Sequence, residues 1–362
     1  MREKDQIGLR EMFSLLAITI GLKGTDITAS VIIGSSINAA WIVIVGSFIC
    51  ICPSLFILNK ILKKQQSKTL LDIIRIGFGK YLSFAFLFMF FIYLLINVST
   101  DSRSYVDQLL TMNLPKTPLF ALFSLFLFVC MWCAKKGWES LGYLAWMIYP
   151  YVIIACGLLF FLLAKEESPM RIFPLIGPGL PTLAKQSFHF GSTFAELFAV
   201  SMMYPYIKDH KTYTKGIVIS SAYCVALVVL FHISYTLAFD FRSADKITYP
   251  FSEATRLVSV GTVITNVETF FLTFWAVCVV IKFAVSIYFL SKLFGFLFQI
   301  EEFEHLIFPL TILILIVGMI PENEIYNIFE VRNFMFYLGT SIYILLPLSL
   351  WTVLKVKEVL NK

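Results

Sequence analysis

Charge is scarce in this sequence. Only 14% of its 362 residues are Asp, Glu, Lys or Arg, whereas a soluble domain carries roughly 25%. This scarcity excludes a soluble protein, because no soluble core could hide a chain that is 59% hydrophobic and 16% aromatic. The apolar residues come in blocks of the roughly 20 residues that a membrane-spanning helix needs. The sequence therefore predicts a polytopic membrane protein.

Motifs of enzymes and nucleotide-binding proteins are also absent. The sequence contains no P-loop, no nucleophile elbow and no HExxH metal spacing. The spacing of Cys130 and Cys133 resembles a metal or redox motif, but all seven cysteines lie inside apolar runs, so we interpret them as helix-packing residues. No cleavable signal peptide is evident. We expect no enzyme activity, no cofactor and no metal site. The net charge of +6 lies in loops between spans, so we expect no nucleic-acid partner.

Hydropathy divides the chain into ten predicted spans, and residues 1–362 are treated as one integral membrane domain. Repeat one covers about 8–164 and repeat two about 184–355, separated by a linker at 165–183 that contains the turn-rich stretch 173–179. The spans are expected at 8–34, 38–62, 81–112, 118–135, 138–164, 184–206, 213–240, 263–293, 303–320 and 333–355.

The distribution of basic residues orients these spans. Of the 29 Lys and Arg residues, 18 fall on the side of the N-terminus and 9 on the other, Arg332 among the latter. Because basic residues accumulate on the cytoplasmic side, we expect both termini to be cytoplasmic. Between spans two and three, residues 68–80 are expected to form an amphipathic helix on the membrane face, with Leu70, Leu71, Ile74 and Ile76 on its apolar side.

Two spans are interrupted at matching places in the two halves. The first contains Gly-Leu-Lys-Gly-Thr-Asp at 21–26, and the second contains Phe-His-Phe-Gly-Ser-Thr-Phe-Ala-Glu at 188–196. Unwound backbone inside a bilayer is tolerated only where it is buried in protein or lines a cavity. Paired interruptions of this kind point to a midplane ligand site between inverted repeats. We therefore predict an all-α membrane fold of ten transmembrane helices in a 5+5 inverted repeat, with helices one and six broken.

The half-helix ends at the breaks are candidate binding groups. Exposed N–H groups suit a carboxylate and exposed carbonyls suit an ammonium. A competing interpretation is that Lys23 and Asp26, three residues apart, only neutralise each other. A polar stripe on span three, including Asn97 and Asp101, either lines an entry vestibule or bonds to neighbouring helices. The candidate ligand-binding residues are Gly21, Lys23, Gly24, Thr25, Asn97, Asp101, Gly191, Ser192, Thr193, Phe194 and Glu196.

Isolated charges within spans invite a functional interpretation, because each costs roughly 2.5–3.5 kcal/mol at the bilayer centre. Glu196 could receive a ligand ammonium, bind a cation or hold a proton, while the role of His189 stays open. Lys282 and Glu268 lie about 21 Å apart along span eight and cannot pair. Lys282 has no evident local partner, so it either stands where a sodium-coupled carrier binds its ion or snorkels to the inner interface.

Four motifs carry a resemblance to a known family. They are Ile-Gly-Leu-Arg-Glu-Met-Phe at 7–13, Phe-Pro-Leu-Ile-Gly-Pro-Gly at 173–179, Phe190-Gly191 with Glu196, and Tyr-Pro-Tyr at 204–206. With them the chain resembles the B subunit of GerA-type spore germinant receptors, the spore germination permease family of the amino acid–polyamine–organocation superfamily. That resemblance implies a LeuT-like fold and a place in the inner membrane of a bacterial endospore.

The same resemblance implies a function and partners. The chain would bind a germinant, often an amino acid, and would work with a receptor A subunit and a lipoprotein C subunit. Ligand groups would contact Gly21–Thr25 and Gly191–Phe194, and Gly24 and Gly191 would let the backbone approach the ligand closely. Two alternatives stay open: a proton-coupled or uniport amino acid transporter, and the ligand-gating part of a germinant-gated ion channel.

Overall fold

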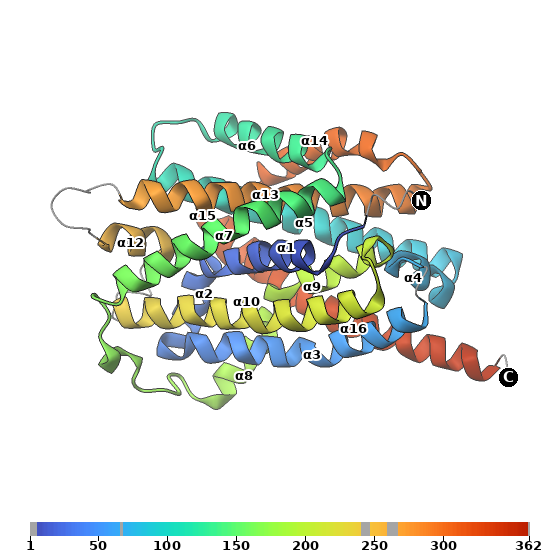
Figure 1. Ribbon diagram of the computed structural model, residues 1–362, viewed down its shortest axis with the longest axis horizontal. Helices are drawn as coiled ribbons and strands as arrows, with labels where there is room; N and C mark the ends of the chain where they lie inside the picture. Colours follow the sequence, from blue (N-terminus) through green and yellow to red (C-terminus); the bar gives the residue numbers. More distant parts are fainter. Residues whose placement is uncertain (1–5, 66–67, 240–246, 259–266, 361–362) are drawn as a thin grey trace.

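A computed structural model describes residues 6–65, 68–239, 247–258 and 267–360 of the chain. Helices account for nearly all of its regular structure, and most of them run along the longest axis of the molecule (Figure 1). In chain order the elements are α1 (Leu9–Gly21), η2 (Leu22–Gly24), α2 (Thr28–Ser36), η3 (Ile37–Ala39), α3 (Ala40–Lys64), α4 (Leu70–Phe78), α5 (Lys80–Met112), α6 (Leu119–Ala134), α7 (Trp138–Leu163), η4 (Pro169–Ile172), α8 (Leu180–His189), η5 (Phe190–Phe194), α9 (Glu196–Ala199), η6 (Val200–Tyr206), α10 (His210–Ala238), α12 (Pro250–Leu257), α13 (Val267–Phe298), η7 (Phe303–Leu306), α14 (Ile307–Gly318), α15 (Glu324–Tyr326), η8 (Asn327–Arg332) and α16 (Asn333–Leu360).

The exterior of the bundle is apolar. Many large hydrophobic side chains point outward, among them Tyr81, Met89 and Phe161 at 87%, 73% and 69% exposure. By length and composition, six helical stretches within the described residues could cross a membrane, at Thr28–Lys64, Lys80–Met112, Trp138–Leu163, His210–Ala238, Glu268–Phe298 and Glu324–Leu360. The prediction of a multi-pass membrane protein is confirmed.

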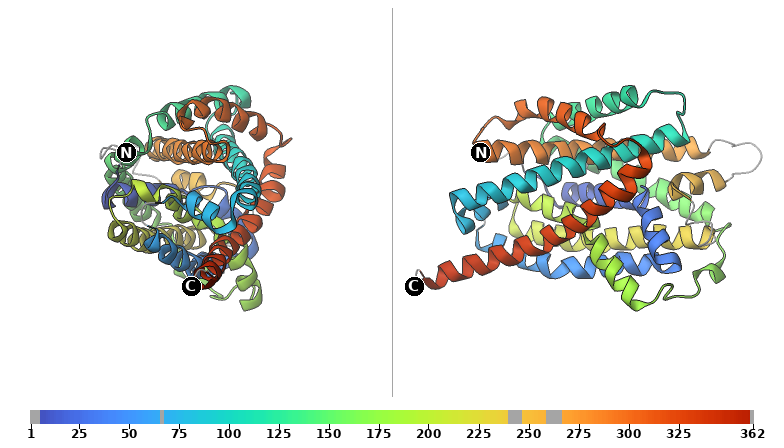
Figure 2. Two further views of the ribbon diagram at one scale, coloured as in Figure 1. Left: turned by 90° about the vertical axis from the view of Figure 1, so that its right-hand side faces the viewer. Right: turned by 180° about the vertical axis from the view of Figure 1, so that it is seen from behind.

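The broken α1–α2 segment occupies the middle of the bundle. α1 packs against α7, α10 and α13, and it ends at Gly21 before the 3₁₀ turn η2. The sixth predicted span is broken as well, since α8 gives way to η5, the four-residue α9 and then η6. Both interruptions that the glycines predicted are therefore present. Figure 2 shows α16 crossing the bundle obliquely, and this helix packs against α3 and η5.

The linker between the two halves is fixed to the corner between α2 and α3. The Asn38 side-chain amide donates to the carbonyls of Arg171, at 2.9 Å, and Phe173, at 2.7 Å. Gly177 has a φ of +47°, and an added Cβ would lie 2.9 Å from the Ser36 carbonyl oxygen. Only glycine combines this backbone conformation with so close an approach.

Two details differ from the sequence predictions. The amphipathic helix exists as α4, capped by Thr69, but Leu70, Leu71 and Ile74 are buried against protein, because α4 packs on α5, α16 and η6. The short helix α12 was not predicted, since its eight residues are too few to give a periodic signal. The predicted end of span seven at 240 and the start of span eight at 263 lie outside the described residues.

The glycines of the breaks face protein, which corrects the expectation that they leave room for a ligand. A Cβ on Gly24 would lie 2.7 Å from the ring of Phe231 on α10, and one on Gly191 would lie 2.7 Å from Thr340 on α16. These glycines therefore let helices approach each other closely.

We predict that Gly24→Ala destabilises the protein by about 1–3 kcal/mol, the usual cost of overpacking a filled core. Phe231 is buried, and its ring would have to shift to make room for the added methyl group. The melting temperature in detergent should fall, and Phe231→Leu should restore part of it. Gly157→Ala is the matched control, because no atom lies within 4 Å of the added Cβ. Equal melting of the two alanine variants would contradict this account.

Candidate functional site

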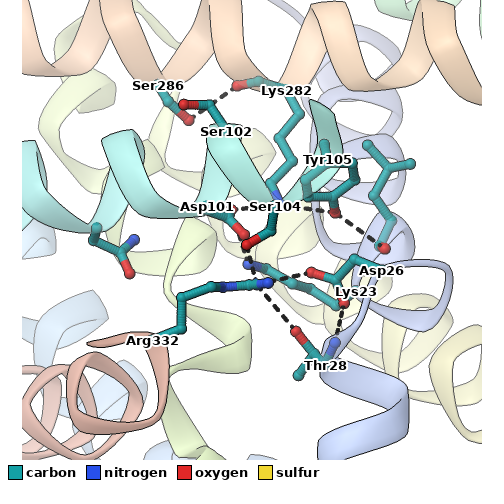
Figure 3. A network of polar contacts seen from close by, with 12 residues as sticks. Lys23, Asp26, Thr28, Asp101, Ser102, Ser104, Tyr105, Lys282, Ser286 and Arg332 are labelled. Carbon is teal, nitrogen blue, oxygen red and sulfur yellow. Dashed lines mark hydrogen bonds and ion pairs between the residues drawn. The ribbon is translucent and has the colours of Figure 1, made fainter. Parts of the chain in front are cut away.

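A single carboxylate, that of Asp101 on α5, joins three cations in the interior (Figure 3). Its Oδ2 lies 2.8 Å from the ammonium nitrogen of Lys282 on α13 and 3.4 Å from that of Lys23 in η2. Its Oδ1 accepts from Nη2 of Arg332, at 2.6 Å. All four side chains are less than a tenth exposed. The cluster therefore ties the first break to α5, α13 and the start of α16.

Arg332 connects this cluster to the second half of the broken helix. Its Nη2 lies 3.1 Å from Oδ2 of Asp26, whose Oδ1 accepts the backbone N–H of Thr28, the first residue of α2. A carboxylate at this position also complements the positive end of the α2 dipole. Arg332 ends η8, a π-helical turn. Such wide turns are rare in proteins overall, and those that occur are often found at functional sites.

Side chains already satisfy the carbonyls of the first break. The Tyr105 hydroxyl donates to the carbonyl of Leu22 at 3.2 Å, and the Tyr235 hydroxyl donates to that of Gly24 at 2.8 Å. Trp275 donates to the hydroxyl of Thr25 at 3.1 Å. The expectation that these carbonyls are open to a ligand ammonium is therefore corrected, because the protein itself caps them.

The second break is tied to α16. The Ser192 N–H donates to the Thr340 hydroxyl at 2.7 Å, and the Ser192 hydroxyl donates to the carbonyl of Phe336 at 2.9 Å. Phe194 packs edge-on against Phe48 in the core. Of the four candidates in η5, only Ser192 also lines the pocket described next.

A small polar pocket lies between the two breaks. Its cavity volume is about 40 Å³. This is room for a few water-sized groups, since one water needs roughly 10–15 Å³ measured in the same way. Both signs of charge line it. The lining residues are Lys23, Tyr93, Asn97, Val98, Asp101, Ser192, Ala195, Glu196, Lys282, Phe283, Ser286, Arg332 and Phe336.

Two charged groups of this pocket carry an atom without a hydrogen-bond partner among the described residues. One is Oε2 of Glu196, and the other is Nη1 of Arg332. Both atoms are buried, and a buried polar group left unpaired costs about 1–3 kcal/mol or more when charged. One atom is an acceptor and the other a donor, so together they suit a molecule that carries both charges.

The pocket brings together six of the predicted site residues. These are Lys23, Asn97, Asp101, Ser192, Glu196 and Lys282. Gly21 and Thr25 instead line an apolar cavity on the other side of α1. Thr193 is buried, with its hydroxyl unpartnered among the described residues.

Several predicted charge roles need correction. Lys282 is not without a partner and does not snorkel, because it pairs with Asp101 and is 2% exposed. Asp26 pairs with Arg332 rather than with Lys23. Arg332 was assigned to an outer loop, but it is buried. Its position one residue before the last predicted span was the only available signal.

Two further polar residues form local pairs outside the pocket. The Nε2 of His189 lies 2.7 Å from Oδ1 of Asn333. Glu268 pairs with Arg256 at 3.0 Å, and both side chains are more than a third exposed. Neither residue contributes to the polar pocket.

Comparison with known proteins gives a consistent result for sequence and fold. The sequence model of the spore germination protein family matches residues 6–326. Spore germination protein KB of Bacillus subtilis (strain 168) is 24% identical over 372 residues, which cover 97% of this chain and 95% of that protein.

Two solved transporters share the fold. Mhp1, a nucleobase-cation-symport-1 family transporter in a closed conformation with bromovinylhydantoin bound, gives a TM-score of 0.60 at 16% identity, covering 92% of this chain and 77% of its own. A Na⁺-coupled sialic acid symporter in a substrate-bound outward-open state gives a TM-score of 0.63 at 11% identity. The match covers 91% of this chain and 76% of the symporter chain. Likeness at this level of identity shows a LeuT-type transporter fold and no more.

We predict that Asp101→Asn destabilises the protein by about 3–5 kcal/mol, because it leaves buried cations without their counter-charge. The melting temperature of the purified protein should fall markedly. Adding Lys282→Met removes one stranded ammonium and should recover part of the loss.

The matched control is Glu358→Gln, which breaks an exposed pair with Lys64 that contributes about 1 kcal/mol at most. If Asp101→Asn melted no lower than Glu358→Gln, the cluster would not stabilise the bundle.

Proposed function

The chain belongs to the spore germination protein family, and from that membership we propose that it is the germinant-binding subunit of a spore nutrient receptor. The germinant would be a small zwitterion, most simply an amino acid, held in the polar pocket between the two breaks. Binding there would trigger germination.

The observation that carries this proposal is the pair of unpartnered charged atoms in the pocket. An ammonium group would complement Oε2 of Glu196, and a carboxylate would complement Nη1 of Arg332. Hydrogen bonds to charged groups are shorter and roughly twice as strong as neutral ones. Side chains rather than the backbone of the breaks would then make the main polar contacts.

Lys282 would act as a fixed charge within the binding subunit. It already bridges α13 to Asp101 on α5 and contacts the ring of Tyr105, whose centroid lies 4.4 Å from the ammonium nitrogen. A built-in cation that holds these helices together removes the need for a bound metal ion at this place. The receptor would therefore signal without a sodium requirement.

The remaining features of the proposal follow the resemblance and the charge bias. Ten transmembrane helices would form a 5+5 inverted repeat, with α6 and α14 as two of the shorter spans. Both termini would face the cytoplasm, and the chain approaches α1 from the end of the bundle at which α16 ends (Figure 1). The subunit would lie in the spore inner membrane with an A subunit and a lipoprotein C subunit.

The transporter fold favours a second candidate function, proton-coupled or uniport movement of amino acids. Glu196 could then carry the proton. Accumulation of labelled amino acid in proteoliposomes of the purified chain separates the two functions. A receptor subunit should bind the amino acid without accumulating it, and a carrier should concentrate it.

We predict that Glu196→Gln raises the germinant concentration needed for half-maximal response at least about tenfold. A hydrogen bond to a charged group contributes about 1.5–3 kcal/mol, and each 1.4 kcal/mol is tenfold in affinity. Germination is followed as the fall in optical density of spores, and immunoblotting verifies the receptor level.

Glu304→Gln, at an exposed position near α14, is the control and should respond normally. A normal response of Glu196→Gln spores at normal receptor level would rule out this carboxylate as the ammonium site.

We also predict that spores respond equally in sodium and in potassium buffers.

Lys282→Ala should impair the germination response, because Asp101 loses one of its cations. Lys282→Arg should retain part of the response, because it keeps the positive charge. A strict sodium requirement in wild-type spores would exclude the fixed-charge role.

A further inference from the structure

The polar pocket adjoins an apolar chamber. The two spaces share Asn97, Val98, Ala195, Glu196, Lys282 and Ser286 as lining residues. The chamber has a cavity volume of about 90 Å³, about twice the 40 Å³ of the polar pocket. It extends toward α4, since Leu70, Leu71 and Ile74 lie on its wall.

The chamber changes character away from the shared residues. Its charged side chains, Glu196 and Lys282, both belong to the shared set. Beyond that set, the hydroxyl of Thr19 is turned back onto its own helix, donating to the Leu15 carbonyl at 2.8 Å. Most of the remaining wall is aliphatic or aromatic, for example Leu94, Phe198, Met202, Val285, Phe289 and Ile342.

Resting on the function proposed above, we propose that the germinant is an amino acid with an apolar side chain, which occupies this chamber. Its charged head would lie in the polar pocket, and its side chain would pass Ala195 into the apolar space. Burying a polar side chain there without hydrogen-bond partners would weaken binding, whereas each buried methylene group would strengthen it.

The first arm of the test compares germinants at fixed head-group chemistry. Spores that carry the complete receptor are given glycine, alanine, valine, leucine, asparagine or aspartate, and a strain lacking this chain gives the background. Leucine or valine should act at concentrations at least tenfold lower than asparagine, which is similar in size to leucine. Equal or better responses to asparagine or aspartate would overturn the inference.

The second arm fills the chamber. Ala199 lines the chamber but not the polar pocket, so Ala199→Phe should raise the half-maximal concentration for leucine at least tenfold and that for glycine or alanine less than threefold. Ala164→Phe, at an exposed position after α7, is the matched control. An equal shift for all amino acids, or no shift, would contradict the assignment of the chamber to the side chain.

The two proposals fail in different ways. If amino acids act through Glu196 but polar ones are preferred, only the apolar-side-chain inference is wrong. If no amino acid elicits a response that depends on this chain, the zwitterion-binding function falls and the inference falls with it.

Discussion

The ion pairs of Asp101 hold the interior of this protein together. Lys23, Lys282 and Arg332 come from three different helical segments, and each would be costly alone in an apolar bundle. A buried carboxylate with several cation partners offsets the desolvation of all of them only if the geometry is good. The distances of 2.6 and 2.8 Å to Arg332 and Lys282 meet that condition. The positions of α5, α13 and the start of α16 relative to the first break therefore depend on one side chain.

The same cluster explains why the first break can exist inside a membrane. Unwinding the chain after Gly21 frees backbone groups that have no water to bond with. Tyr105 caps the Leu22 carbonyl and also accepts from Lys282 at 3.0 Å, so the ion cluster and the capped backbone share a residue. A change in the charges around Asp101 would thus reach the broken helix through a hydrogen bond that already exists. Under the proposed function, ligand binding in the pocket would act on the broken helix through these hydrogen bonds.

The sequence predicted local features well and distant pairings poorly. Glycine and polar residues within apolar runs located both breaks, because a membrane leaves few other uses for them. The partners of Asp101 could not be predicted, since Lys23 lies 78 residues away in the sequence and Arg332 lies 231 residues away. Nothing in a single sequence links positions so far apart. Arg332 in particular has the sequence context of an ordinary loop residue. A π-helical turn nevertheless places it inside the bundle.

The glycines show a second limit of reasoning from sequence. A glycine at a break permits close approach, but the pattern does not say what approaches. At Gly24 and Gly191 the neighbours are Phe231 and Thr340, so the close contacts are between helices. Under the proposed function, charged side chains rather than these glycines would recognise the ligand. With every group in its usual charge state, Lys23, Lys282 and Arg332 balance Asp26, Asp101 and Glu196. A zwitterion leaves that balance unchanged, whereas a lone ion would add an uncompensated charge to a buried site at a cost of several kcal/mol.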